Sequence, residues 1–187
     1  MSTVELRIES WTPRQFEARM SEAMTIYALA MNYSPSAGVQ RGLAAVSHTK
    51  LAGFACRIAL TDTGEMVGFG YGYVSKPGQW WHELASRAID RKLARFWMAD
   101  AFELSELHVL PDYQGNRIGR RLLLQLAEGL TNRTLVLSTP DADTRAFRMY
   151  RSLGFVDLAR GHIFPGDSRP FAVLGRTLPF EPSLAPR

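Results

Sequence analysis

The stretch "ELHVLPDYQGNRIGRRLL", residues 106–123, decides the fold, because it joins a predicted strand to a predicted helix through a turn. Seven consecutive residues, Gly115 to Arg121, include two glycines and three arginines. The unpaired N–H groups and the dipole at a helix N-terminus attract anions, and glycines let the backbone fold closely around one. The stretch therefore predicts an anion-binding site at the start of a helix.

The spacing of these glycines excludes two common phosphate-binding loops. No Gly-Lys-Ser/Thr follows them, as a P-loop requires, and they do not form the G-x-G-x-x-G dinucleotide pattern. A second glycine-rich run, "GFGYGY" at 68–73, lies inside a predicted strand with no helix after it. We interpret that run as a place where a neighbouring backbone approaches closely, and not as a phosphate site.

The composition is that of an ordinary globular protein. The chain has 187 residues, 46% of them hydrophobic, which predicts a single domain over 1–187. The formal net charge of +4 fits an anionic ligand but is too small to indicate nucleic-acid binding. The single cysteine, Cys56, excludes an internal disulfide framework and favours a reducing compartment. With no signal-peptide pattern and no membrane-spanning run, we expect a cytoplasmic protein without a membrane partner.

Strands and helices are predicted to alternate along the chain. Alternating or β-rich apolar runs predict strands at 4–10, 54–61, 65–74, 103–110, 133–139, 155–164 and 171–178. Helical spacing predicts helices at 12–31, 39–51, 80–99, after the glycines of the opening stretch, and within 141–153. No internal repeat or linker interrupts this order, which indicates an α/β (α+β) architecture.

The opening stretch resembles the acyl-CoA signature of the GNAT (GCN5-related N-acetyltransferase) superfamily. That signature reads Arg/Gln-x-x-Gly-x-Gly/Ala after a strand with a Val-x-Pro-like turn. Residues Gln114 to Gly119 occupy its six positions. Arg117 departs from the pattern, since the family usually has its first glycine there. Its side chain would crowd the pyrophosphate, or point outward while its N–H still donates, or add a charge-assisted contact.

A second stretch, "DTRAFRMYRSLGF" at 143–155, is similar to a later helix of the same family. That helix is commonly written Asn-x-x-Ala-x-x-x-Tyr-x-x-x-Gly-Phe. Ala146, Tyr150, Gly154 and Phe155 match it, and Asp143 replaces the asparagine. We expect Asp143 to serve as the N-cap of this helix. Two motifs in the right order, separated by a strand, make the resemblance specific.

The resemblance implies a GNAT-like acyl-CoA acyltransferase fold, with a mixed, mostly antiparallel sheet flanked by helices. The segment at 80–99 departs from this pattern, since it inserts an extra helix between strands that the family joins directly. The implied activity is transfer of an acetyl group from acetyl-CoA to a primary amine of a small molecule or a peptide N-terminus. The amine would attack directly in a ternary complex, without a covalent enzyme intermediate.

The chemistry requires a base for the amine, donors for the oxyanion and an acid for the leaving thiolate. Glu106 and His108 are two apart on a predicted strand and therefore share one face, so either residue, or a water, is the candidate base. Tyr150 matches the family's acid position, and the Val109 N–H is expected near the thioester carbonyl. The resemblance implies a CoA-binding set of Leu107, Val109, Gln114, Gly115, Asn116, Arg117, Ile118, Gly119, Arg120, Asp143 and Tyr150.

Other interpretations of these residues stay open. Tyr150 would otherwise be a packing aromatic, Glu106 a solvated charge and His108 a hydrogen-bonded core histidine. The alternative function is a catalytically silent acyl-CoA-binding sensor or interaction module of the same fold, and a longer acyl donor is a further alternative. The sequence predicts no metal site, leaves a homodimer open, and does not name the acceptor.

Overall fold

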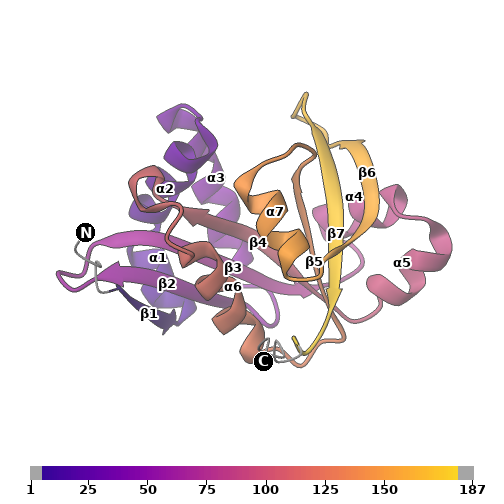
Figure 1. Ribbon diagram of the computed structural model, residues 1–187, viewed down its shortest axis with the longest axis horizontal. Coiled ribbons are helices and arrows are strands. Elements are labelled where there is room, and N and C mark those ends of the chain that lie inside the picture. Colours follow the sequence, from indigo (N-terminus) through magenta and orange to yellow (C-terminus); the bar gives the residue numbers. More distant parts are fainter. Residues whose placement is uncertain (1–5, 181–187) are drawn as a thin grey trace, which may run out of the picture. The chain divides into compact units, whose positions relative to one another are not determined.

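The computed structural model describes residues 6–180 of the chain. Its seven strands in this range, rich in apolar residues, form one mixed sheet (Figure 1). The strands are β1 (Leu6–Trp11), β2 (Ala55–Thr61), β3 (Met66–Ser75), β4 (Ala101–Val109), β5 (Thr134–Pro140), β6 (Val156–Ile163) and β7 (Pro170–Thr177). Their hydrogen-bonded order is β1-β2-β3-β4-β5-β7-β6. β4 and β5 are parallel, whereas β1/β2, β2/β3, β5/β7 and β6/β7 are antiparallel. The predicted fold class is confirmed.

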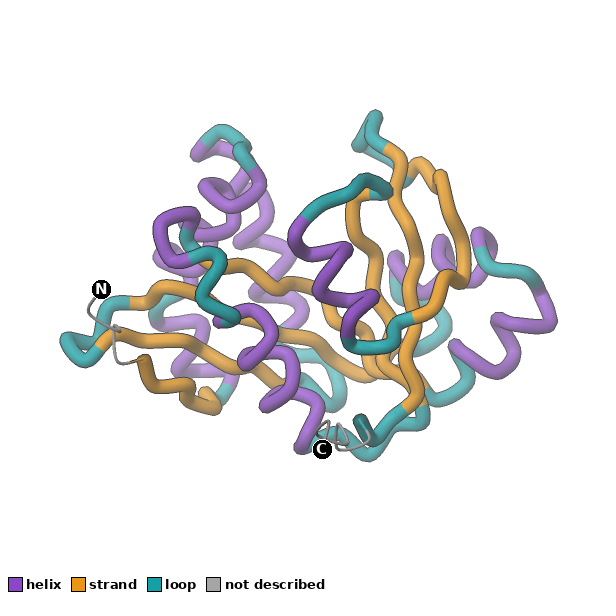
Figure 2. Tube along the Cα trace, viewed as in Figure 1, coloured by secondary structure: helices purple, strands orange, loops and turns teal. Residues whose placement is uncertain are grey.

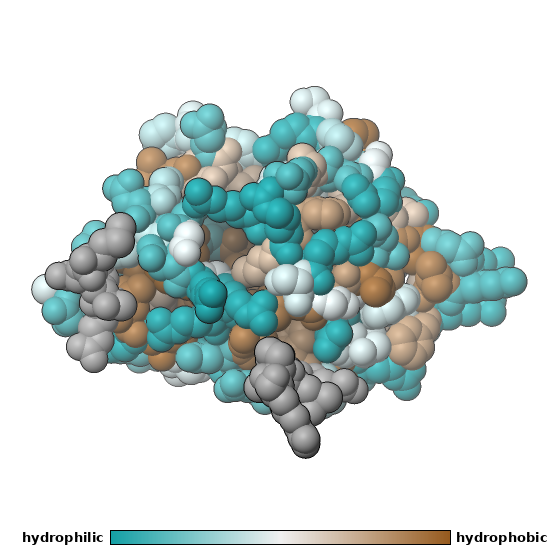
Figure 3. Space-filling view, viewed as in Figure 1, coloured by the Kyte–Doolittle hydropathy of each residue, from teal (hydrophilic) through white to brown (hydrophobic). Residues whose placement is uncertain are grey.

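Helices separate most of these strands, as Figure 2 shows along the Cα trace. They are α1 (Pro13–Ala18), α2 (Met20–Met31), α3 (Pro35–His48), α4 (Trp80–Ala88), α5 (Arg91–Trp97), the 3₁₀ turn η1 (Pro111–Tyr113), α6 (Ile118–Glu128) and α7 (Arg145–Ser152). On the face drawn in Figure 3, hydrophilic and apolar residues intermingle at the surface.

The contacts divide the chain into two compact units. The first contains the described residues up to 73 together with 104–126, and the second contains 74–103 together with the described residues from 127 onward. Each unit has a hydrophobic core of its own. β3 and β4 begin in one unit and end in the other.

In the first unit, helices cover both faces of the sheet (Figure 1). Buried side chains of α1, α2 and α3 pack against Phe69 and Tyr71 of β3 on one face. α6 covers the other face with Ile118 and Leu122. The glycines of "GFGYGY" lie on this second face, where a Cβ at Gly68 would be only 3.1 Å from the backbone carbonyl oxygen of His108. The interpretation of this run as a close approach is therefore confirmed.

In the second unit, α4 and α5 pack on β5 and β7 around Trp81, whose indole Nε1 donates to Ser138 Oγ at 3.0 Å. The predicted single helix at 80–99 is wrong, because the chain is extended at Ile89 and a new helix starts at Asp90. The Asp90 carboxylate accepts from Lys92 N at 2.9 Å, which is an N-cap interaction. Phe96 of α5 is 42% exposed, whereas Trp81 of α4 is buried.

Two other helix predictions are corrected by local interactions. The helix expected at 12–31 is broken at Arg19, whose side chain bonds Glu22 and the Gly64 carbonyl and lies over the Trp11 ring. The N-cap of α7 is Thr144 and not Asp143, because Thr144 Oγ1 accepts from Phe147 N at 3.0 Å.

Two element boundaries also differ. α3 starts four residues earlier than the predicted helix at 39–51, at Pro35 after Ser34. Residues 4 and 5 of the predicted first strand lie outside the described residues.

Candidate active site

The turn between β4 and α6 is shaped by two residues with left-handed backbone conformation. Gly115 has φ +83° and Arg117 has φ +60°. The Gln114 side chain donates to the Val109 carbonyl at 3.0 Å, and the Asn116 side chain donates to the Tyr113 carbonyl at 3.1 Å. These bonds hold the turn at the end of the strand. Turns of this kind, leading into a helix, present backbone N–H groups to an anion.

Arg117 adopts the left-handed conformation that a glycine would adopt without strain. Its side chain is exposed, as is Asn116, while Gly119 and Arg120 are half-buried in the first turn of α6. The off-pattern arginine is therefore compatible with the backbone path of the turn, at a conformational cost of roughly 1–2 kcal/mol.

Some of the predicted CoA-binding residues have side chains that pack in the hydrophobic core. Ile118 is 2% exposed and packs with Val67, Val109 and Leu122, and Leu107 packs against the same cluster. The buried Ile118 side chain leaves only its backbone groups to meet a ligand, whereas the Leu107 side chain is partly exposed. The sequence pattern alone does not separate such anchors from contacting residues.

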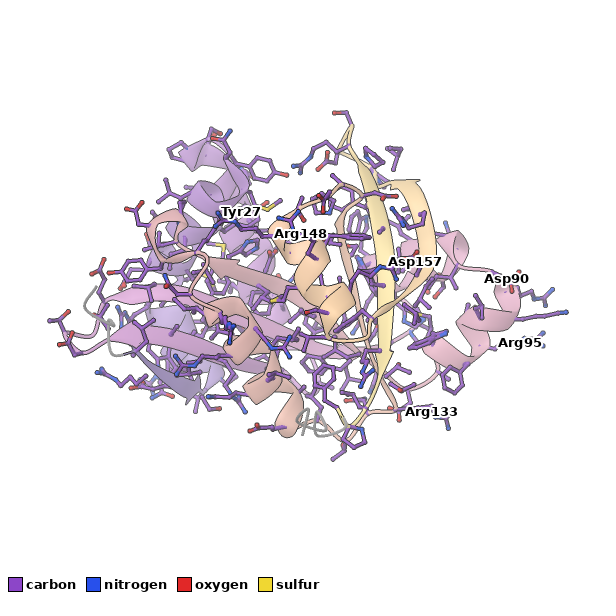
Figure 4. The ribbon with its side chains drawn as sticks, viewed as in Figure 1. Tyr27, Asp90, Arg95, Arg133, Arg148 and Asp157 are labelled. Carbon is purple, nitrogen blue, oxygen red and sulfur yellow. The ribbon has the colours of Figure 1, made fainter. Side chains whose placement is uncertain are left out.

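Glu106 and His108 project from the same face of β4, as predicted. His108 Nε2 lies 2.5 Å from Glu106 Oε2; the Glu106 side chain is buried, and that of His108 is partly buried. The His108 ring is flanked by Tyr27 of α2, edge-on at 5.2 Å between ring centroids, and by Phe69 of β3 at 5.7 Å. Tyr27 is labelled in Figure 4. The interpretation of Glu106 as a solvated charge is wrong, because this side chain is only 6% exposed.

Arg41 of α3 is a member of this cluster that the sequence did not reveal. Its Nε donates to Glu106 Oε1, and its Nη2 lies 3.4 Å from Ser105 Oγ. The two partners are 65 residues apart in the chain. In the sequence Arg41 looks like a helix arginine between Gln40 and Gly42, and only the packing of α3 on the sheet brings it to Glu106.

The electrostatics of this cluster are dominated by the ion pair between the buried Glu106 and the partly buried Arg41. Burial alone would raise the pKa of Glu106, but the charge of Arg41 and the bonds from His108 and Arg41 hold it well below its ordinary value. The pKa of Arg41 is raised in turn, chiefly by Glu106. Burial and the nearby Arg41 lower the pKa of His48 to about 4, and its Nδ1 lies 3.0 Å from the Tyr71 hydroxyl. His48 is thus neutral at physiological pH.

The later motif lies in the second unit, on and around α7. Tyr150 is 5% exposed and meets Phe155 edge-on, with ring centroids 5.4 Å apart. Gly154 follows the end of α7 with φ +79°, a left-handed conformation typical of a glycine after a helix. Asp143 is exposed and accepts from Arg148, labelled in Figure 4, at 2.7 Å.

Within 6–180, no group of three or more His, Cys, Asp or Glu side chains is arranged to hold a metal ion. No helix in this part of the chain has the length and hydropathy to span a membrane.

Comparison with known proteins links both motifs to one family. A GCN5-like protein acetyltransferase of Mycobacterium tuberculosis is 36% identical to this chain, over 89% of the chain and 95% of its own length. The ribosomal-protein-S18-alanine N-acetyltransferase of Escherichia coli has a similar fold, with a TM-score of 0.63 at 18% identity, covering 92% of this chain and 94% of its own.

A second solved structure, yncA of Salmonella typhimurium with its cofactor acetyl-CoA, also has a TM-score of 0.63. It is 16% identical, and 98% of each chain is covered. The model of the acetyltransferase (GNAT) family matches residues 9–155, which include β2 to β5, the turn between β4 and α6, and the helix that carries Tyr150. This chain therefore belongs to the GNAT family of acetyltransferases.

Proposed function

We propose that this protein is a cytoplasmic N-acetyltransferase whose single domain, residues 1–187, transfers an acetyl group from acetyl-CoA to a primary amine. The observation that carries the proposal is the position of the Glu106–His108 pair on β4, a few residues before the Gly115–Arg117 turn. A proton acceptor and an anion-binding turn are thereby fixed on one continuous stretch of backbone. Membership of the acetyltransferase family supports acyl transfer as the chemistry.

Each site residue has a separate role in the direct attack of the amine on acetyl-CoA. The Glu106–His108 pair removes the proton from the acceptor ammonium, and the amine nitrogen forms a bond to the acetyl carbon. The Val109 N–H stabilises the oxyanion, and the Tyr150 hydroxyl protonates the thiolate as the carbon–sulfur bond breaks. Backbone N–H groups of Gly115, Asn116, Arg117 and Gly119 bind the pyrophosphate, with Arg120 adding positive charge.

For the acceptor, we propose an amine carried by a protein. The support is the Mycobacterium tuberculosis relative, 36% identical, which is named a protein acetyltransferase. The charges of the Glu106 cluster agree with this, because Arg41 neutralises Glu106 and leaves no excess negative charge there to attract a polyamine.

Calorimetric titration with acetyl-CoA, CoA and ATP tests the cofactor half of the proposal. We expect acetyl-CoA and CoA to bind with micromolar Kd and ATP to bind much more weakly. The double variant Gly119→Trp/Arg120→Ala should lose this binding, whereas Arg121→Ala, an exposed position on the same helix, should keep it. Equal acetyl-CoA affinity of the double variant and the parent would overturn the assignment of the turn.

Release of free thiol in the presence of acceptor panels tests the enzyme half. Proteins and peptides with free amines should be acetylated faster than small polyamines or amino acids. Binding of acetyl-CoA with no turnover on any acceptor would instead identify a silent sensor of the same fold.

A further inference from the structure

We propose that Arg41 is a positioning residue, which keeps Glu106 an ionised carboxylate so that Glu106 orients His108 and His108 takes the proton from the acceptor amine. This inference rests on the proposed function, whose candidate bases were Glu106, His108 or a water. It assigns orientation to Glu106 and proton transfer to His108, and it adds Arg41 of α3 as a third residue of the site.

The hydrogen bonds to Glu106 keep its carboxylate ionised. Arg41 Nε donates to one carboxylate oxygen, and His108 Nε2 lies 2.5 Å from the other. Both oxygens are therefore occupied, in a side chain that is only 6% exposed. A buried carboxylate paired with a guanidinium is a weak proton acceptor, because protonation would leave the guanidinium charge uncompensated. Glu106 is held as an anion and does not act as the base.

The orientation of His108 follows from this anion. With Nε2–H donating to Glu106 Oε2, Nδ1 is the ring nitrogen whose lone pair accepts a proton. Tyr27 and Phe69 lie against the ring at 5.2 and 5.7 Å between centroids and restrict its rotation. The His108 side chain is 11% exposed, so the ring has an accessible edge, unlike Glu106. In the reaction, Nδ1 gains the ammonium proton, and the resulting imidazolium is stabilised by the Glu106 anion.

Arg41 contributes the fixed positive charge among the groups that face Glu106. Arg41 and His48 of α3 and His108 of β4 interact with Glu106, and Tyr27 of α2 and Tyr71 of β3 interact with Arg41. His48 is neutral near pH 7, because its pKa is lowered to about 4. Removal of the Arg41 charge should therefore let the Glu106–His108 pair bind a proton at higher pH.

The test uses pH profiles of kcat/KM for Arg41→Met, Arg41→Lys and the parent, with Arg14→Met on α1 as the exposed matched control. Arg41→Met should lower kcat about tenfold or more and move the acidic limb of the profile up by about one to three pH units. Arg41→Lys keeps the positive charge, so the acidic limb of its kcat/KM profile should lie at nearly the same pH as in the parent. Acetyl-CoA affinity should stay unchanged in all variants.

A double-mutant cycle with Glu106→Gln tests whether Arg41 acts through Glu106. In the Glu106→Gln background, adding Arg41→Met should have little further effect on kcat, because the carboxylate it positions is gone. The double variant also removes both buried charges, so it provides a folded sample should either single variant be unstable.

Two results would overturn the inference. One is a loss of activity in Arg41→Met with an unshifted profile, which is what a merely structural role produces. The other is faster turnover of Arg41→Met at alkaline pH, which would identify Glu106, released from its partner, as the base.

Titration of the His108 ring by NMR, with and without Arg41, does not depend on turnover. An upward shift of its midpoint in an inactive protein would leave the inference standing while the proposed function fails. An unshifted midpoint in an active protein would overturn the inference and leave the proposed function standing.

Discussion

Gly38 of α3 packs against the backbone carbonyl of Met24 in α2, so closely that a Cβ on Gly38 would lie 2.7 Å from the Met24 oxygen. Because that atom belongs to the backbone, the two helices would have to separate to admit a methyl group. α3 carries Arg41, so this contact also fixes where the guanidinium meets Glu106. A glycine is thus needed at the helix crossing that assembles the candidate site.

Gly38→Ala should destabilise the protein by about 1–3 kcal/mol through overpacking, despite the better helix propensity of alanine. Gly42→Ala is the matched control one turn later, where the nearest atom is Met24 Cγ at 3.3 Å in a flexible side chain. Its effect should be small, within about 1 kcal/mol, because the gain in propensity offsets the tight contact. Urea unfolding of both variants measures the difference, and equal stability would contradict the packing argument.

His108→Ala should lower kcat by about 10²–10⁴-fold, since it removes the residue proposed to accept the proton. The Kd for acetyl-CoA should change little, whereas the melting temperature should fall, because the variant leaves a void beside Tyr27 and Phe69 and removes a bond to Glu106. Steady-state kinetics with saturating acetyl-CoA provide the measurement. Retention of full activity would remove His108 from the mechanism.

Arg117 tests whether backbone conformation or side-chain charge matters in the turn. Arg117→Gly should keep the acetyl-CoA Kd within about threefold and raise stability by at most about 1 kcal/mol, because strain relief is offset by unfolded-state entropy. Arg117→Val should lower stability by about 1–2 kcal/mol and weaken binding about tenfold, since a β-branched residue resists φ +60°. If both variants lose affinity equally, the side chain makes the contact.

Stability should decrease as the pH falls from about 6.5 towards 4, because His48 is neutral in the folded protein and protonated when unfolded. Its pKa is lowered to about 4 from the ordinary 6.5, so the unfolded state binds more protons in this window. The loss linked to Glu106 begins only below its ordinary pKa of about 4.3. Melting temperatures from pH 7 to 5 should fall by several degrees, with a smaller fall in His48→Asn.

Thr144→Ala should cost about 1 kcal/mol of stability, because it removes the side-chain oxygen that caps α7. Asp143→Ala should cost less than about 0.5 kcal/mol, since the exposed ion pair with Arg148 contributes little. The two neighbours form a matched pair for chemical denaturation. A larger effect at Asp143 would restore it as the cap.

Helix boundaries illustrate how far local sequence signals reach. The break at Asp90 carries a readable signal, since aspartate is a common N-cap, yet apolar periodicity continues across it and predicts one helix. The break at Arg19 carries no such signal. It depends on bonds to Glu22 and to the distant Gly64 carbonyl, which exist only after β1, α2 and the β2–β3 turn have packed together.

The sequence by itself determined the family, the glycine-containing turn after β4 and the shared face of Glu106 and His108. Each of these depends on residues close together in the chain, where strand periodicity and turn chemistry are set by local geometry. Only the tertiary structure decided that Glu106 is an ion-paired, buried anion, that Arg41 is its partner and that His48 is neutral. Burial and Coulomb interactions depend on distance in space, and 65 residues of chain separate Arg41 from the carboxylate it binds.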